Sequence, residues 1–281
     1  GRYYAGADGE PDGVAQAIED FYLPRHAGDD LPGAGVAEAL AIADRIDTLT
    51  GIFGIGQPPT GDRDPFGLRR AALGLVRIAV ERRVDFDLDQ TLEASAAAHG
   101  DRIDAAETPA QVRAFVVERM RYWYQDAGIS PAVFEAVASA SPSSLVDMDD
   151  RIRAVVSFAD LPEAEALAAA NKRIANLLKK SAGHDAPAAG HAIEPSRFEP
   201  AETSLLSALD TAREEIAPLL AARDYRAALK RLAALREPVD RFFDEVMVMA
   251  EDPALRANRL ALLARLKGTF MEIADVARLN G

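Results

Sequence analysis

The sequence contains no cysteine and few aromatic residues, which make up only 6% of the chain. Without cysteine the chain can form neither a disulfide framework nor a thiolate metal site. Scarce aromatic residues and abundant alanine disfavour sandwiches and barrels and favour packed helices. No apolar run is as long as the ~18 residues that a membrane-spanning helix needs, so no membrane segment is expected.

The chain also lacks an initiator methionine and a signal sequence, because it begins with Gly1-Arg2-Tyr3-Tyr4. Its 281 residues are enough for two domains under the usual relation between length and domain number. About half of the residues are apolar, which is enough to build a core. We therefore expect a two-domain portion of a longer protein.

The net charge of −13 argues against a general nucleic-acid-binding protein. The charge is unevenly distributed, however. Residues 1–159 contain 15 Lys and Arg against 26 Asp and Glu, whereas residues 160–281 contain 17 against 19. The C-terminal part is therefore nearly neutral, with its arginines clustered on particular helices, and it can bind RNA locally while the rest repels it.

Apolar residues recur at helical spacing along most of the chain, and no run alternates with a period of two. Helices are expected near 14–21 and at 36–53, 108–127, 130–140, 145–158, 163–180, 202–220, 225–236, 238–250 and 252–279. One more is expected to start at Asp64-Pro65, since Asp caps free amides and Pro fits the first turn. The predicted fold class is all-α.

The stretch 181–200 breaks this pattern with Gly, Pro, Ala and His. It is longer than the connections that compact domains usually contain, and it offers no apolar stripe to bury. We expect it to be a flexible connection that proteases cut first.

No complete catalytic site is visible in the sequence. The only His-Asp dipeptide, His184-Asp185, lies in the predicted connection. Asp44 and Asp47 share a helix face and could hold a metal, but a solvated or capping role is favoured because no histidine partner is evident. The glycines of GIFGIGQ follow no predicted strand, so they do not indicate a dinucleotide site. We assign no catalytic residue and no metal.

Five segments, taken in order, resemble the β subunit of bacterial glycyl-tRNA synthetases. They are FYLPRHAGDDLP (21–32), ALAIADRIDTLTGIFGIGQPPTGDRDPFGLRRAALG (40–74), YWYQDAGI (122–129), ANKRIANLLKK (170–180) and FFDEVMVMAEDPALRANRLALLARLKGTFMEIADVARL (242–279). Together they span nearly the whole chain. Each is modest alone, but the ordered set is specific.

The resemblance implies an HD-like helical domain with connecting helices at 1–159, followed by an anticodon-binding helix bundle of the DALR type at 160–281. The stretch Asp252-Pro253-Ala254-Leu255-Arg256 is similar to the DALR signature. The flexible stretch 181–200 is then an insertion between the first two helices of the bundle. The sequence departs from an active HD pattern, which puts any phosphohydrolase activity in doubt.

The family implies the tRNA-recognition portion of a cytoplasmic glycine–tRNA ligase. The expected partners are tRNA(Gly), the α subunit and the upstream part of the β subunit. Aminoacylation would take place on the α subunit, which would use ATP and Mg, so no cofactor is expected on this chain and it is expected to be non-catalytic alone. Two alternatives stay open: a helical scaffold for subunit assembly, or a degenerate HD-type phosphohydrolase.

Glycine anticodons end in two cytosines, and an unpaired cytosine needs hydrogen-bond donors and an acceptor, whereas phosphates need Arg or Lys. The candidate tRNA-binding residues are Asn171, Lys172, Arg173, Arg256, Asn258, Arg259, Arg69 and Arg70. Arg256 and Arg259 share a helix face and are expected to grip one stretch of backbone. For any of these residues, a solvated face or an ion pair within the fold is the alternative. Tyr122, Trp123 and Tyr124 could stack on a base, although a core role is favoured.

Overall fold

The computed structural model describes residues 1–181 and 193–280, and these residues form helices and connecting turns without an extended strand. The all-α prediction is confirmed. Much of the predicted flexible connection, residues 182–192, lies outside the described residues. In the part of the chain that the structure describes, no helix is both long and apolar enough to cross a membrane.

Contacts between Cα atoms divide the chain into two compact units. The first comprises residues 1–128 and 143–149, and the second comprises 129–142 and the chain from 150 onward. The predicted boundary at residue 160 therefore falls within the second unit. The reason is that helix α7 (Pro131–Ala138) packs on the short helix η3 (Val276–Leu279), where the amide of Asp275 donates to the carbonyl of Ala136 at 2.8 Å.

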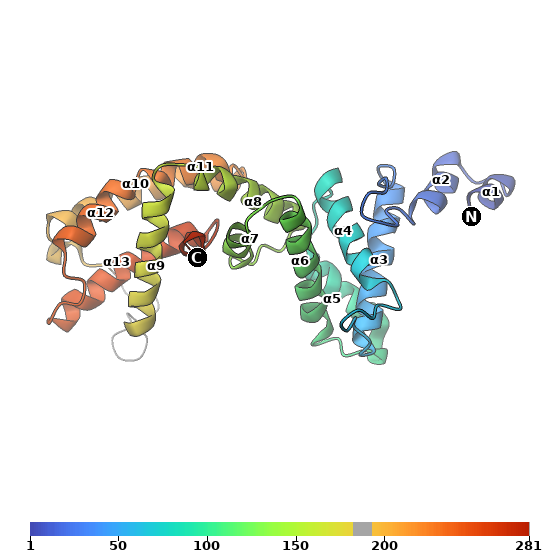
Figure 1. Ribbon diagram of the computed structural model, residues 1–281, viewed down its shortest axis with the longest axis horizontal. Helices are drawn as coiled ribbons and strands as arrows, with labels where there is room; N and C mark the ends of the chain where they lie inside the picture. Colours follow the sequence, from blue (N-terminus) through green and yellow to red (C-terminus); the bar gives the residue numbers. More distant parts are fainter. Residues whose placement is uncertain (182–192, 281) are drawn as a thin grey trace. The chain divides into compact units, whose positions relative to one another are not determined.

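The first unit contains a group of four helices that pack against one another (Figure 1). Its helices are α1 (Arg2–Ala7), α2 (Asp12–Asp20), α3 (Val36–Gly54), α4 (Leu68–Arg82), α5 (Leu88–His99), η1 (Gly100–Arg102) and α6 (Thr108–Asp126). The group consists of α3 to α6, and its fully buried core includes Leu49, Leu75, Val76, Leu92, Val116 and Met120. Sequence periodicity missed α5, because alanine fills much of that helix and its apolar stripe is weak.

Helix α4 begins at Leu68 and not at the predicted Asp64-Pro65. Gly67 adopts the left-handed conformation, with φ at 69°, and forms a turn before the helix. The Asp64 carboxylate still caps the helix, since it accepts the amides of Leu68 at 2.8 Å and Arg69 at 3.0 Å. The predicted cap is present, but the chain turns once before the helix starts.

The second unit is a bundle in which α9 and α10 each contact α12 and α13 (Figure 1). Its helices are α7, α9 (Ala164–Ser181), η2 (Pro195–Arg197), α10 (Pro200–Ala221), α11 (Tyr225–Ala233), α12 (Arg236–Glu245), α13 (Pro253–Met271) and η3, and α8 (Leu145–Ala159) enters it from residue 150. Leu205, Leu209, Leu232, Phe242, Leu263, Leu266 and Phe270 are almost fully buried in its core.

The C-terminal part of the predicted flexible connection is tied down. Asn258 on α13 accepts the amide of Glu194 at 2.8 Å and donates to the carbonyl of Glu194 at 3.0 Å. Helix η2 follows directly, and Glu199 then caps α10. Asn258 thus anchors Glu194, and the residues that follow form η2 and the start of α10. The flexibility of the connection stays a prediction.

The cap of α5 makes a small pH dependence testable. Asp87 accepts the amide of Gln90 at 2.9 Å, and this hydrogen bond lowers the pKa of Asp87 below its ordinary value. A lowered pKa means that the cap stabilises the fold above about pH 4 and that this contribution is lost as the pH falls through the pKa in the folded protein. We expect Tm to fall more steeply from about pH 5 to 3 in the unmutated protein than in Asp87→Asn, since Asn caps without titrating. Parallel Tm profiles in thermal unfolding contradict this prediction.

Candidate nucleic-acid interface

Helix α9 has one face in the core and the opposite face exposed. Leu167 and Ile174 are buried, whereas Lys172, Asn176 and Lys180 are exposed. The exposed residues follow one another at a spacing of four, which places them on one side of the helix. The helix therefore presents a polar, basic stripe to solvent.

This stripe forms part of a hollow of about 370 Å³, which lies mostly along α9 and which we call the α9 hollow. It is lined by Ala169, Lys172, Arg173, Asn176, Leu177, Lys180 and Asn280. The lining contains three cationic side chains and two amides, and it contains no carboxylate. Within residues 1–181 and 193–280, none of the three cations forms an ion pair.

Two of the three cations of the α9 hollow are held in place by contacts with groups that carry no negative charge. The Lys172 ammonium donates to the carbonyl of Asn280, a residue far away in the sequence. The Arg173 guanidinium lies 4.2 Å from the centroid of the Phe243 ring, in a cation–π contact. Lysine and arginine neutralise phosphates, and an amide offers both a donor and an acceptor to the edge of an unpaired base. The arrangement can therefore hold a short stretch of single-stranded RNA.

Two of the predicted residues, Lys172 and Arg173, meet in this hollow, whereas their neighbour Asn171 does not. Asn171 is buried, and its amide nitrogen donates to the carbonyl of Leu167 at 2.9 Å. Sequence reasoning missed Asn176, Lys180 and Asn280. The spacing of four from Lys172 could have identified Asn176 and Lys180, but nothing in the sequence places Asn280 beside α9.

Arg259 is part of the core and not of an RNA-binding surface. Only 3% of the residue is exposed, and its guanidinium donates to Glu202 at 2.8 Å and to Glu199 at 3.0 Å. Hydrogen bonding to the buried Glu202 carboxylate raises the pKa of Arg259 above its ordinary value. The predicted contact with phosphate is not compatible with this geometry, in which Arg259 joins α13 to α10 as an ion pair within the fold.

Arg256 and Asn258 also act on the chain itself. Arg256 donates to the carbonyl of Ala250 at 2.7 Å, and Arg259 donates to the carbonyl of Met247 at 2.8 Å. The two arginines thus hold the loop between α12 and α13. Because Arg259 is buried, the predicted joint grip on an RNA backbone does not fit this geometry, and RNA contact by Arg256 alone stays a prediction. Asn258 is buried and holds Glu194 as described above.

In the first unit, Arg69 and Arg70 point differently at the start of α4. Arg69 is half-buried and donates to the carbonyl of Gly61, whereas Arg70 is exposed. Tyr122 and Tyr124, two members of the aromatic run at 122–124, also differ in exposure. Tyr124 is only 6% exposed, as a core role requires, but Tyr122 is 42% exposed.

The structure brings a histidine to one of the two aspartates considered as metal ligands. His99 Nε2 lies 3.1 Å from Asp47 Oδ1, a proximity that the sequence did not reveal. In the described part of the chain, no group of three or more His, Cys, Asp and Glu is arranged to hold a metal ion. Asp44 and Arg70 both line another hollow.

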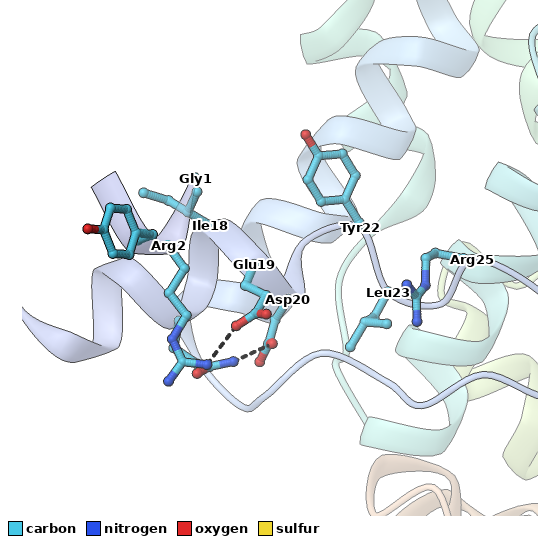
Figure 2. A pocket seen from close by; sticks show the side chains of 10 residues that line it. Gly1, Arg2, Ile18, Glu19, Asp20, Tyr22, Leu23 and Arg25 are labelled. Atoms are coloured by element: carbon cyan, nitrogen blue, oxygen red, sulfur yellow. Dashed lines mark hydrogen bonds and ion pairs between the residues drawn. The ribbon is translucent and has the colours of Figure 1, made fainter. Parts of the chain in front are cut away.

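A further hollow of about 820 Å³ lies beside α1 and α2 (Figure 2). Its polar lining includes the carboxylates of Glu19 and Asp20, and Arg2 already pairs with Glu19 at 2.6 Å. Carboxylates repel phosphates, so this hollow is less suited to RNA than the α9 hollow.

The second unit is thus a helical bundle with a basic, amide-lined hollow, and residues 167–276 match the family model described as DALR anticodon binding domain. This match places the unit in the class of anticodon-binding bundles. Residues 1–139 match the family model described as glycyl-tRNA synthetase beta subunit. The chain belongs to the glycyl-tRNA synthetase β-subunit family.

The curated relatives agree over the whole chain. The glycine–tRNA ligase beta subunits of Pseudomonas aeruginosa and Haemophilus influenzae are 51% and 50% identical to it over 280 residues. That of Pseudomonas putida is 49% identical over 281 residues. The chain spans about 40% of the length of these relatives.

Proposed function

We propose that this chain is the tRNA-recognition portion of a bacterial glycyl-tRNA synthetase β subunit, working in the cytoplasm. Its second unit binds the anticodon arm of tRNA(Gly) at the α9 hollow. The aminoacylation chemistry takes place on the α subunit, where ATP and Mg are used, and this chain contributes binding.

One observation carries the proposal. In a chain of net charge −13, the α9 hollow gathers Lys172, Arg173 and Lys180 with two asparagines and without a carboxylate. The family match provides the context for this chemistry. Asn171, Asn258 and Arg259 are buried, and Arg256 holds the loop between α12 and α13, so we propose RNA contact for the exposed α9 residues in their place.

Neutralising the α9 hollow should weaken tRNA binding in a salt-dependent way. The variant replaces Lys172, Arg173 and Lys180 with glutamine in the full-length chain assembled with its partner subunit. Each lost phosphate contact on single-stranded RNA reduces the log–log salt slope by about 0.7, so we expect a slope reduced by about 2 and affinity lower by roughly tenfold. Fluorescence titration of tRNA(Gly) at several salt concentrations measures both.

The matched control is glutamine at Lys230, Arg236 and Arg241, three exposed cations on α11 and α12 of the same unit. It removes the same charge but leaves the α9 hollow intact. If both triple variants weaken binding equally, the effect is one of net charge and the α9 hollow has no special role.

Base recognition is tested separately through Asn176. An amide that reads a base edge discriminates by about 1–3 kcal/mol, by analogy with DNA recognition. We therefore expect Asn176→Ala to reduce, by roughly tenfold, the preference for tRNA(Gly) over a transcript with a substituted anticodon cytosine. An unchanged preference places base recognition elsewhere.

The scaffold function is the second candidate, and the same variants distinguish it. If the α9 triple variant binds tRNA(Gly) normally but assembles poorly with the α subunit, the basic stripe is a protein interface.

Catalysis is tested on the isolated chain, which should give no ATP–pyrophosphate exchange because it contains no adenylate-forming motif.

A further inference from the structure

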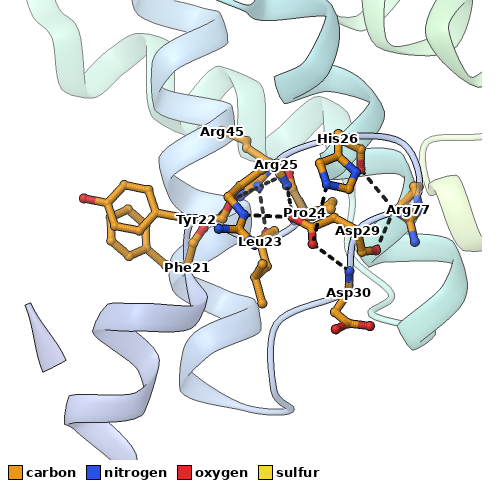
Figure 3. A network of polar contacts seen from close by, with 10 residues as sticks. All are labelled: Phe21, Tyr22, Leu23, Pro24, Arg25, His26, Asp29, Asp30, Arg45 and Arg77. Atoms are coloured by element: carbon orange, nitrogen blue, oxygen red, sulfur yellow. Dashed lines mark hydrogen bonds and ion pairs between the residues drawn. The ribbon is translucent and has the colours of Figure 1, made fainter.

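Two buried arginines fix the loop at residues 21–30 of the first unit (Figure 3). Arg45 on α3 donates to the carbonyls of Phe21 at 3.1 Å, Leu23 at 2.7 Å and Pro24 at 3.2 Å. Arg77 on α4 donates to the carbonyl of Asp29 at 3.0 Å. The loop is therefore held through its backbone, and the side chains of Arg25 and His26 remain exposed.

This fixed loop forms part of the wall of two hollows that share one arginine. The first, of about 250 Å³, is lined by Arg25, Asp44, Phe66 and Arg70, among others. The second, of about 230 Å³, is lined by Ala27, Arg69, Arg70, Arg119, Trp123 and Asp126, among others. Arg70 lies on the border between them, and we call this surface the Arg70 ridge.

The charges at the Arg70 ridge differ from those of its surroundings. Residues 1–159 contain 15 basic and 26 acidic side chains, yet the second hollow combines three arginines with one carboxylate. Arg70 is exposed and, among the described residues, forms no hydrogen bond or ion pair. An exposed cation without a partner is available to a phosphate.

Aromatic side chains adjoin this cation. Trp123 is half-buried in the wall of the second hollow, and Tyr122 stands beside it with 42% of its surface exposed. The guanidinium carbons of Arg119 and Arg121 lie 4.6 and 4.5 Å from the centroid of the Tyr122 ring, in cation–π contacts, and both side chains also pair with Glu118, at 3.0 and 3.8 Å. Aromatic rings next to arginines are the usual means of binding an unpaired base together with its phosphate.

We propose that the Arg70 ridge binds one unpaired nucleotide of RNA, with its base against Trp123 in the second hollow and its phosphate at Arg70. Asp126 accepts a hydrogen bond from an exocyclic amine of the base. This inference rests on the proposed function, because it assigns to the first unit a second contact with the same tRNA. A protein partner is a less suitable occupant, because the hollow sets an aromatic ring beside the exposed cation, and this pairing suits a base with its phosphate better than an acidic side chain.

The test uses tRNA(Gly) and the full-length chain assembled with its partner subunit. Trp123→Ala is expected to weaken binding about tenfold, in line with the loss of one stacked base, whereas Trp123→Phe retains most of the affinity. Arg70→Gln is expected to reduce the salt slope by about 0.7 to 0.9. The control is Arg102→Gln, an exposed arginine of η1 that lines neither hollow.

Two further measurements make the outcome decisive. A photo-crosslinking phenylalanine analogue at position 123 should attach to a single-stranded nucleotide of the tRNA, and thermal unfolding shows whether each variant is folded. If the folded variants at 70 and 123 bind tRNA(Gly) normally while the α9 variants do not, the ridge inference fails and the proposed function stands. If the unmutated protein does not bind tRNA(Gly), the proposed function itself fails. Loss of subunit assembly without loss of tRNA binding assigns the ridge to a protein partner and overturns the inference.

Discussion

Replacing Glu202 with alanine is expected to lower the free energy of unfolding by about 3–5 kcal/mol. Glu202 has no exposed surface, and its carboxylate accepts from Arg259 Nε at 2.8 Å and from Arg259 Nη2 at 3.1 Å. Without this carboxylate, Arg259 stays buried between α10 and α13 with much of its charge uncompensated. The loss therefore reflects an unpaired buried cation more than a missing attraction.

Glu199→Ala provides the control, because Glu199 contacts the same guanidinium but its side chain is 60% exposed. Solvent screens such a contact, and we expect a loss of less than about 1 kcal/mol. Urea denaturation of the three proteins gives the comparison. Equal losses for the two variants contradict the prediction. A double variant, Glu202→Leu with Arg259→Met, should recover much of the lost stability, since it removes both buried charges together.

Replacing Arg45 with methionine is expected to destabilise the first unit by about 3 kcal/mol, since hydrogen bonds from a charged group are worth about 1.5–3 kcal/mol each and are not additive. Arg45 is only 6% exposed, and burial lowers its pKa below the ordinary value. Its donors satisfy backbone carbonyls of residues 21–24, which methionine leaves without this partner. Hydrogen exchange in the loop 21–30 should accelerate while α5 and α6 stay protected.

Arg82→Met is the matched control, because Arg82 also donates to a loop carbonyl, that of Pro32, but its side chain is 41% exposed. We expect its loss to be below about 1 kcal/mol. If Arg45→Met leaves exchange in the loop 21–30 unchanged, other contacts suffice to hold the loop, and the ridge is not fixed by Arg45.

Local sequence signals predicted the helices well where apolar residues recur strongly. The helix expected at 36–53 is observed as α3, and the one expected at 163–180 is observed as α9. The signal failed at α5, where alanine replaces larger apolar residues. It also placed the start of α4 too early, because Asp64 caps the helix across a turn.

The candidate interface was only partly predictable, for a physical reason. Residue type suggested Arg256 and Arg259 as RNA ligands, but type does not show whether a guanidinium meets a phosphate or the carbonyls and carboxylates of its own fold. That choice depends on partners distant in sequence, such as Glu202, which lies on another helix. Lys172 and Arg173 were chosen by the same reasoning, and both line the α9 hollow. Their contact with RNA stays a prediction.

Because the arginines of the DALR-like stretch on α13 hold the fold, the construction of the bundle and its exposed polar surface depend on different residues. Arg256 and Arg259 determine how the loop between α12 and α13 is built, while the α9 hollow contributes the exposed cations and amides. If the α9 hollow binds RNA as proposed, mutations on the outer face of α9 can change which RNA is preferred without unfolding the bundle. On the proposed function, the RNA preference of this bundle is to be sought along α9, and not at the arginines of the DALR-like stretch.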